Sequence, residues 1–386
     1  MRLSDQERRL RLVRRHHLGR TAGHPSDVVE SIAALHSSDP VTPFLASWAR
    51  VPGFEVADLE RELYEDRRIW RMHSMRRTLF LVPVGDAPVF AAVAAEIARK
   101  ERVRLAQWVG GELGSKAFEK WLERLVALIL EALDGRELST RQLTEIVPEL
   151  ERQITVGAGK WAATVPVSSR VLYLMAMEGF LVRTRPAGTW RSSQYRWAVV
   201  ADWFGTELER IEEGQARATL ARRYLATHAP VTMTDLRWWT GWTLKAAKEA
   251  LSEVEVSTVE LDSGETGLVL GEDDGSEPMA DMSVALLPAL DSTTMGWKER
   301  DWYLGAHGTE LFDTNGNAGP TVWVDGRVVG GWGQRGDAQV VYHLLEEVVA
   351  EAGQLIDGAA GSLTDWLDGV IVMPRFPSPL GRRLAD

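Results

Sequence analysis

The stretch LHSSDPVTP at residues 35–43 joins two apolar runs whose spacing of three and four residues is typical of helices. The first run ends at residue 35, and the second covers residues 44–51. A histidine, two serines and an aspartate are therefore expected at the joint between two helices, where a rigid support exposes polar side chains and functional sites are common. The sequence on either side of this joint predicts the rest of the fold.

Helix signals lie on both sides of the joint. Residues 5–17 form an amphipathic helical pattern among arginines, and Ser26 or Asp27 is a suitable cap for the next helix. A further helix is expected to begin near Asp39 or Thr42, because each precedes a proline and proline favours the first helical position. The joint is therefore predicted to lie between two capped helices.

A basic hairpin is expected to follow these helices. Residues 58–70 predict one more helix, and residues 71–83 alternate as a strand does until Pro83 ends the run. Helices followed by a basic hairpin are the order of a winged helix-turn-helix. After a helical connector at 87–134, the same order is predicted again, with helices at 139–146 and 167–179 before an arginine-rich hairpin at 180–197. A third helix-turn-helix is predicted from helices at 215–228, 232–240 and 244–251 with a glycine-containing turn between the last two.

The pattern changes after residue 254, where short β-rich runs alternate with glycines and acidic residues. The dipeptide Asp325-Gly326, flanked by valines and tryptophans, is a strong hairpin signal. Residues 339–356 predict one amphipathic helix, and residues 369–373 predict a last strand. The C-terminal part is therefore expected to be a separate β-rich domain with one packed helix.

These patterns predict a mainly α fold with α+β elements, in which three tandem winged helix-turn-helix units precede a small C-terminal domain that resembles a β-barrel. The expected boundaries are a first winged helix at 1–83, a helical connector and second winged helix at 84–200, a third winged helix at 201–255, and a β-rich domain at 256–386.

The charge of the chain is unevenly distributed. The formal net charge is −11 over 386 residues, but residues 253–281 hold ten acidic residues and no lysine or arginine, so the remainder is close to neutral. Arginines are concentrated at 1–20, at 66–77 and at 181–198. Because the local field decides where a polyanion binds, this distribution is compatible with a nucleic-acid partner. Each cluster could equally be an ordinary solvated helix face.

Several classes of protein are excluded by what the sequence lacks. The chain has no cysteine, which excludes disulfides, thiolate zinc sites and cysteine nucleophiles. No dinucleotide, phosphate-loop or zinc-protease motif occurs, so we expect neither a cofactor nor a metal. No apolar run is long enough for a membrane span, and the N-terminal arginines do not fit a signal peptide. We therefore expect a cytoplasmic protein.

The run LHSSDPVTPFLASWARVPGFEVADL, together with LLPALDSTTMGWKER, VDGRVVGGW and RFPSPLGRRL, resembles a family of winged-helix DNA glycosylases typified by AlkZ and YcaQ. The resemblance covers most of the chain. It implies tandem winged helices in a C-shaped scaffold closed by a small β-barrel. Members carry a Gln-x-Gln or Gln-x-Asp motif. Here His36 stands at the first position of the motif, Ser38 at the second, and Asp39 one residue later.

His36, Ser38 and Asp39 are accordingly the candidate catalytic residues. In a helix His36 and Asp39 would share a face, whereas in an extended segment His36 and Ser38 would do so. Cleavage of a glycosidic bond builds positive charge on the sugar, which a carboxylate stabilises, and a histidine can orient water or accept its proton. The alternative is structural, with Asp39 as a helix cap and His36 as a hydrogen-bonded histidine at a helix end.

The basic hairpins supply the candidate DNA contacts. We expect the arginines to position the phosphate backbone rather than to react. His73 could contact a phosphate or a flipped base, although a lone histidine is more often structural, and Asp291 is expected to be structural. The candidates are His73, Arg76 and Arg77 in the first hairpin and Arg183, Arg185, Arg191 and Arg196 in the second.

The sequence thus predicts a monomeric, metal-free protein that binds double-stranded DNA, alkylated or crosslinked, and has no membrane partner. The expected activity is that of a monofunctional DNA glycosylase, which hydrolyses the N-glycosidic bond of bulky N7-alkylated purines in DNA repair or self-resistance to a genotoxin. The alternative is a winged-helix protein that recognises DNA or damaged DNA without catalysis. A ligand-responsive regulator would need a dimer interface and a ligand pocket, and the sequence indicates neither.

Overall fold

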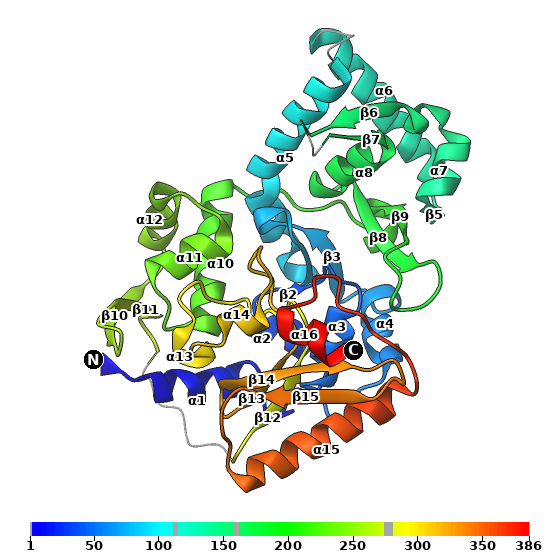
Figure 1. Ribbon diagram of the computed structural model, residues 1–386. Coiled ribbons are helices and arrows are strands. Elements are labelled where there is room, and N and C mark those ends of the chain that lie inside the picture. Colours follow the sequence, from blue (N-terminus) through cyan, green and yellow to red (C-terminus); the bar gives the residue numbers. More distant parts are fainter. Residues whose placement is uncertain (1, 111–114, 158, 160–161, 274–280, 386) are drawn as a thin grey trace.

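A computed structural model describes residues 2–110, 115–157, 159, 162–273 and 281–385 of the chain (Figure 1). Residues 274–280 of the acidic stretch and residues 111–114 of the predicted helical connector lie outside the described residues. The described chain forms separate small sheets, each associated with helices, rather than one central sheet.

The first repeat contains the joint at residues 35–43 and a three-stranded sheet of order β2-β4-β3. Its elements, in chain order, are α2 (Pro25–Ser31), β2 (Leu35–His36), α3 (Thr42–Trp48), α4 (Val56–Tyr64), β3 (Ile69–His73), the 3₁₀ turn η1 (Met75–Arg77) and β4 (Leu79–Pro83).

The second repeat has the same order of helix, strand, helix, helix and hairpin, and its sheet has the order β5-β9-β8. It follows the 3₁₀ turn η2 (Val84–Asp86) and the long helix α5 (Ala87–Gly110). Its elements are α6 (Ser115–Leu133), β5 (Leu138–Ser139), α7 (Thr140–Ile146), an inserted 3₁₀ turn η3 (Pro148–Glu151) with hairpin β6 (Gln153–Val156) and β7 (Ala163–Pro166), α8 (Ser168–Met177), β8 (Leu181–Pro186) and β9 (Tyr195–Val199).

The third repeat follows the short helix α9 (Val200–Phe204). Its first strand is reduced to one bridge between Val231 and Leu268. The N-terminal strand β1 (Arg2–Leu3) joins its sheet by pairing parallel to β10, and the helix α1 (Asp5–Arg15) follows β1. Its elements are α10 (Glu213–His228), α11 (Met233–Thr240), α12 (Leu244–Ser252), β10 (Val256–Leu261) and β11 (Thr266–Leu270).

Local sequence explains where many of these helices begin and end. The side chain of Thr232 accepts a hydrogen bond from the backbone N–H of Asp235, whose carboxylate accepts one in return from Thr232, so α11 starts with a capping box. The helix ends at Gly241, whose φ of 76° is the left-handed conformation that glycine adopts without strain. α2 differs from the prediction, because His24 is its N-cap and Asp27 completes the capping box from inside the helix.

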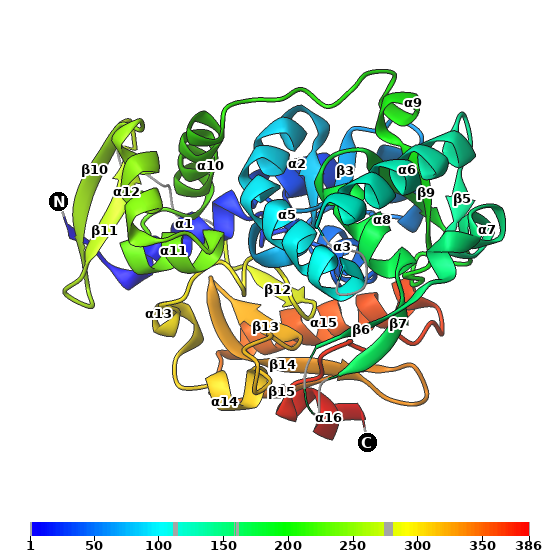
Figure 2. The same ribbon diagram turned by 90° about the horizontal axis from the view of Figure 1, so that it is seen from above.

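The C-terminal part contains an antiparallel four-stranded sheet of order β12-β13-β14-β15. α15 contacts both edge strands, β12 and β15, and so crosses the sheet (Figure 2). The elements are β12 (Val284–Leu287), α13 (Asp301–Leu304), α14 (Gly308–Leu311), β13 (Thr321–Val324), β14 (Arg327–Gln334), β15 (Val340–Leu344), α15 (Ala350–Leu367) and α16 (Pro379–Ala385).

The predicted small barrel is wrong, because this sheet is open in the described chain and β12 and β15 remain its unpaired edges. Closure would require β12 and β15 to pair with each other, and α15 instead contacts both of these strands. The helix predicted at 339–356 is also wrong, since Val340–Leu344 pairs with β14 and α15 begins only at Ala350. The strand predicted at 369–373 is not formed.

One further helix boundary differs from the prediction. α4 ends at Tyr64, and the last residue of the predicted helix, Trp70, lies on β3 instead. Pairing of β3 with β4 therefore overrides the apolar helical spacing of this segment.

The three repeats and the C-terminal sheet enclose two hydrophobic cores in the described residues. One core is shared by the first repeat, the third repeat and the C-terminal sheet, and the other belongs to α5 and the second repeat. In Figure 1 the second repeat forms an upper lobe, joined to the rest by α5, while the third repeat lies at the left and the C-terminal sheet lies below. The segment at residues 35–43 lies where these parts meet.

Candidate active site and nucleic-acid interface

The strand β2 ends at His36, and residues 37–39 continue as a loop that is not helical and bends at Ser38 and Asp39. His36 belongs to β2 and pairs with Phe80 on β4. If the alternation of this strand continued past His36, His36 and Ser38 would lie on one side and Ser37 on the other. Two contacts agree with this arrangement, because the backbone N–H of Ser38 points to Nδ1 of His36 at 3.4 Å, whereas Ser37 Oγ accepts a hydrogen bond from Arg71 Nε at 2.9 Å.

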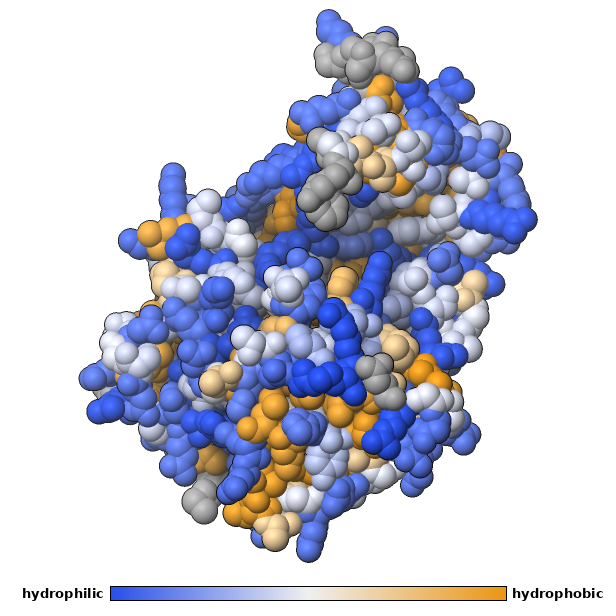
Figure 3. Space-filling model, viewed as in Figure 1, coloured by the Kyte–Doolittle hydropathy of each residue, from blue (hydrophilic) through white to orange (hydrophobic). Residues whose placement is uncertain are grey.

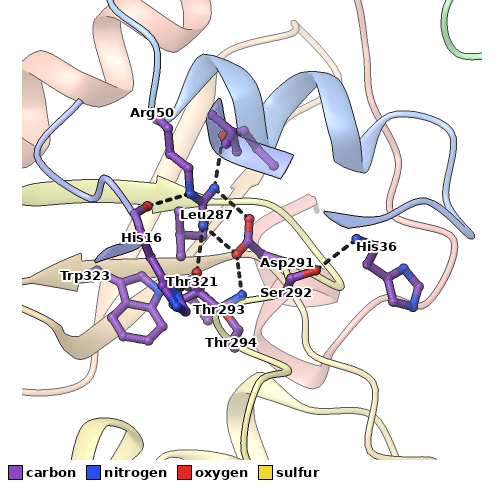
Figure 4. Close-up of polar contacts among 12 residues, drawn as sticks. His16, His36, Arg50, Leu287, Asp291, Ser292, Thr293, Thr294, Thr321 and Trp323 are labelled. Atoms are coloured by element: carbon purple, nitrogen blue, oxygen red, sulfur yellow. Dashed lines mark hydrogen bonds and ion pairs between the residues drawn. The ribbon is translucent and has the colours of Figure 1, made fainter. Parts of the chain in front are cut away.

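The backbone of His36 is fixed by a hydrogen bond, whereas its imidazole ring takes no part in that contact. Its backbone N–H donates to Ser292 Oγ at 2.9 Å, and Figure 4 shows the imidazole pointing away from that contact. The ring meets the edge of Phe80 at 5.8 Å. Burial, aided by the charge of Arg76, lowers the pKa of His36 to about 4. The imidazole is therefore neutral at pH 7, and since Nδ1 faces the N–H of Ser38, the ring proton is assigned to Nε2.

Asp39 is buried and its carboxylate is occupied by backbone donors. Oδ1 accepts from the N–H of Val41 at 3.3 Å, and Oδ2 accepts from the N–H of Arg375 at 2.9 Å. Burial raises the pKa of Asp39. No hydrogen bond joins Asp39 to His36 in the part of the chain that the structure describes. The geometry thus gives Asp39 a bracing contact with the C-terminal segment and separates it from the face shared by His36 and Ser38.

A buried ion pair lies directly behind His36 (Figure 4). Arg50 and Asp291 are both fully buried and make a bidentate pair, with N–O distances of 2.8 and 2.9 Å. The remaining guanidinium hydrogens bond to the carbonyls of His16 and Ala46 and to the hydroxyl of Thr293. This pair joins the first repeat to the loop that supports His36 through Ser292. These contacts agree with a structural role for Asp291, whereas its partner Arg50 could not be identified from the sequence pattern.

The predicted DNA contacts of the second hairpin fall into two groups. Arg196 is exposed, and Arg191 is exposed with one hydrogen bond, at 2.8 Å, to the carbonyl of Ile371. Arg185 instead pairs with Glu60 and Glu65 of the first repeat. Arg183 is partly buried, with its guanidinium 4.5 Å from the centre of the Trp197 ring.

The first hairpin packs against neighbouring elements. Arg76 and Arg77 have φ values of 54° and 64°, a strained left-handed tip for two non-glycine residues. Arg76 lies over the ring of Trp238 in the third repeat at 4.6 Å, and Arg77 pairs with Glu101 of α5. His73 is partly buried, and its ring meets the Tyr173 ring at 4.5 Å. These three residues therefore link the repeats as well as lining the surface between them.

A group of residues absent from the predicted site lies beside Ser37. Arg71 is only 2% exposed, although the sequence places it in a basic patch. Its Nη1 donates to the hydroxyl of Tyr64 at 2.9 Å, and its guanidinium lies 4.6 Å from the centre of the Tyr195 ring. The sequence offers one indication of the position of Arg71, which lies next to Trp70 in a run that alternates as a strand does. Alternation alone does not decide which face of the strand Arg71 occupies.

Two surfaces stand out in the space-filling view. Hydrophilic side chains cover much of the region where the upper lobe meets the rest, and an apolar patch lies below, over the C-terminal sheet (Figure 3).

In the described residues no three histidine, aspartate or glutamate side chains gather as metal ligands would. Among the helices described, none is long and apolar enough to cross a membrane.

Known proteins provide the comparison. The sequence profile of the family described as "DNA glycosylase AlkZ-like" matches residues 29–366. The solved structure of Streptomyces sahachiroi DNA glycosylase AlkZ superposes with a TM-score of 0.71 at 18% sequence identity, covering 95% of this chain and 98% of that chain. No curated protein sequence matches the chain. At this identity the structural match concerns the fold, whereas the family profile extends over most of the sequence.

Proposed function

The chain belongs to the AlkZ-like family of DNA glycosylases, and on that premise we propose that it hydrolyses the N-glycosidic bond of bulky N7-alkylated purines in double-stranded DNA. The observation that supports the proposal most directly is the loop after β2, where the backbone N–H of Ser38 meets the ring of His36, so that the two residues expected at the positions of the family motif lie side by side. The three repeats, interpreted as winged helices with the boundaries given above, would provide the DNA-binding scaffold. We also propose that the protein is a monomer and is located in the cytoplasm.

The proposed chemistry uses two hydrogen-bond donors. Nε2–H of neutral His36 and the hydroxyl of Ser38 lie on the same face, and the Ser38 oxygen already accepts from the N–H of Leu79 at 3.4 Å. Two such donors can hold the oxygen of an attacking water or an acceptor atom of the leaving base. An N7-alkylated purine carries a positive charge and leaves readily, so a site without a strong general acid is sufficient. Asp39 would brace this segment through its two backbone contacts.

The direct test is base release from a duplex that contains N7-methylguanine or a bulkier N7 adduct. We expect release from the alkylated duplex and none from the unmodified one, and the bulky adduct should be the better substrate. Binding of the alkylated duplex without any release of base would instead support the alternative, a protein that recognises damaged DNA without catalysis. The occupied carboxylate of Asp39 is the observation that favours this second candidate.

The exposed arginines of the second hairpin are expected to contact phosphates. Because each phosphate contact releases counterions, the logarithm of the duplex association constant should fall linearly with the logarithm of salt concentration. Replacing Arg191 and Arg196 together by alanine should reduce the magnitude of that slope by about two and weaken binding at low salt. Arg335→Ala removes an exposed arginine from the β14–β15 hairpin, outside the repeats, and serves as the control. Equal slopes for all three proteins would contradict the assignment.

A further inference from the structure

The interface between β3 of the first repeat and the β8–β9 hairpin of the second contains two guanidinium groups without a carboxylate partner. Arg71 is 2% exposed, and within the described part of the chain its hydrogen bonds go to neutral groups, the hydroxyls of Ser37 and Tyr64. Arg183 is partly buried against Trp197 and forms no ion pair within the described residues. Buried charges are normally paired, because removing an ion from water is costly. Two cations without a carboxylate partner among the described residues therefore give this interface an excess of positive charge.

Two neighbouring polar atoms lack partners as well. The hydroxyl of Tyr195 is buried with no hydrogen-bond partner in the described chain, although its ring lies directly under the Arg71 guanidinium. Nδ1 of His73, which lies within reach of the charge of Arg183, is also buried without a partner. Buried polar atoms are nearly always hydrogen-bonded, and an exception requires an explanation.

The protonation states make this interface rich in donors. Burial raises the pKa of Tyr195, so its hydroxyl keeps its proton at pH 7. Burial lowers the pKa of Arg183 to about 10, which still leaves the guanidinium charged at neutral pH. The carboxylate that acts on Tyr195 is Asp39, and both of its oxygens already accept backbone hydrogen bonds. Donors and positive charge thus exceed the acceptors that the protein supplies.

We propose that Arg71, Arg183 and Tyr195 form an anion subsite that takes one phosphodiester group of a nucleic-acid strand. Arg183 and the Tyr195 hydroxyl would donate to the phosphate oxygens, and Arg71 would supply charge from behind. Because Arg71 bonds to Ser37, which lies between His36 and Ser38, a phosphate held here would fix the position of the adjoining nucleotide relative to the proposed catalytic face. The identity of the anion as nucleic acid rests on the proposed function, whereas the anion subsite itself rests on the contacts alone.

Tyr195→Phe separates this role from a structural one. The hydroxyl has no partner in the protein, so its removal should leave the melting temperature unchanged or raise it. The same change should weaken the binding of inorganic phosphate, measured by calorimetry, about tenfold, which is the usual effect of losing one hydrogen bond to a charged group. Arg183→Gln should weaken phosphate binding at least as much.

Thr184→Val is the matched control. Thr184 is fully buried on β8 beside Arg183, its hydroxyl also lacks a partner, and its side chain points to the opposite face of the strand. Valine keeps its shape, so phosphate affinity should stay at the wild-type value. If phosphate does not bind the wild-type protein, or binds Tyr195→Phe as tightly as wild type, the subsite is overturned.

A second measurement tests the nucleic-acid assignment. Affinity for a short duplex at low salt should fall several-fold in Tyr195→Phe and stay unchanged in Thr184→Val. Phosphate binding that depends on Tyr195, with duplex affinity that does not, would show a site for free anions and overturn the assignment to a strand. Absence of base release by the wild-type protein would contradict the proposed glycosylase activity. It would not change what the phosphate and duplex affinities show about the anion subsite.

Discussion

Base release by the His36→Ala variant is expected to fall about 10²–10³-fold, which is the usual effect of removing one hydrogen-bond donor that acts on the reacting atoms. His36 is anchored by its backbone N–H to Ser292, so loss of the ring leaves β2 in place and should change the melting temperature and duplex affinity little. His36→Gln introduces the glutamine that the resemblance leads us to expect at this position, and it should recover part of the rate. The measurement is single-turnover release of an N7-alkylated purine.

Asp39 provides the control for this result. Asp39→Asn keeps the shape, but its single oxygen cannot accept from both Val41 and Arg375, so stability should fall by about 1–3 kcal/mol. If Asp39 only braces the segment, release by the folded Asp39→Asn protein should stay near wild type. A large loss of release at unchanged melting temperature would instead make Asp39 a catalytic carboxylate. Release by His36→Ala at the wild-type rate would remove His36 from the proposed chemistry.

Asp291→Ala is expected to lower the free energy of unfolding by about 3–5 kcal/mol, because it leaves the guanidinium of Arg50 buried without its negative partner. Arg50 and Asp291 are both 0% exposed, so water cannot replace the lost carboxylate. The remaining acceptors of Arg50, including the carbonyls of His16 and Ala46, are neutral and do not balance the charge. Equilibrium unfolding in urea measures the change.

An exposed ion pair is the comparison for this prediction. Arg141 and Glu145 form an i,i+4 pair on α7 with side chains 88% and 62% exposed. Such pairs contribute about 0.3–0.5 kcal/mol, so Glu145→Ala should have a small effect. Replacing Arg50 and Asp291 together by Met and Leu removes both charges, and this double variant should be more stable than Asp291→Ala alone. A loss below about 1 kcal/mol for Asp291→Ala would show that the pair does not hold the first repeat to the C-terminal part.

The elements that the sequence predicted well are those specified by local signals. Thr232 with Asp235 starts α11, Gly241 ends it, and Asp325-Gly326 turns β13 into β14, and each of these depends on residues no more than a few positions apart. The errors occur where distant pairing decides the structure. The local spacing of Val340–Leu344 predicts part of an amphipathic helix, but this segment pairs with β14 as a strand. The spacing around Trp70 also predicts a helix, but Trp70 lies on β3, which pairs with β4.

The site shows the same division. The segment at 35–43 could be singled out because its polar residues interrupt two apolar runs, and both possible faces of His36 could be stated in advance. Which face forms depends on the pairing of His36 with Phe80, which lies far away in sequence. The arginines of the second hairpin looked equivalent as a basic patch. Their separation into exposed Arg196, paired Arg185 and partly buried Arg183 follows from packing of this hairpin on the first repeat, which no local pattern encodes.

The contact between Asp39 and Arg375 has a consequence for the order in which the protein is completed during synthesis. The two residues are 336 positions apart, and Arg50 and Asp291 are 241 apart, so the segment that carries His36 emerges from the ribosome long before the parts that fix it. Contacts of such sequence separation form late, because closing long loops costs entropy before they stabilise the fold. The nascent first repeat therefore remains without its C-terminal brace until nearly the whole chain has been translated, which delays assembly of the proposed catalytic face until then.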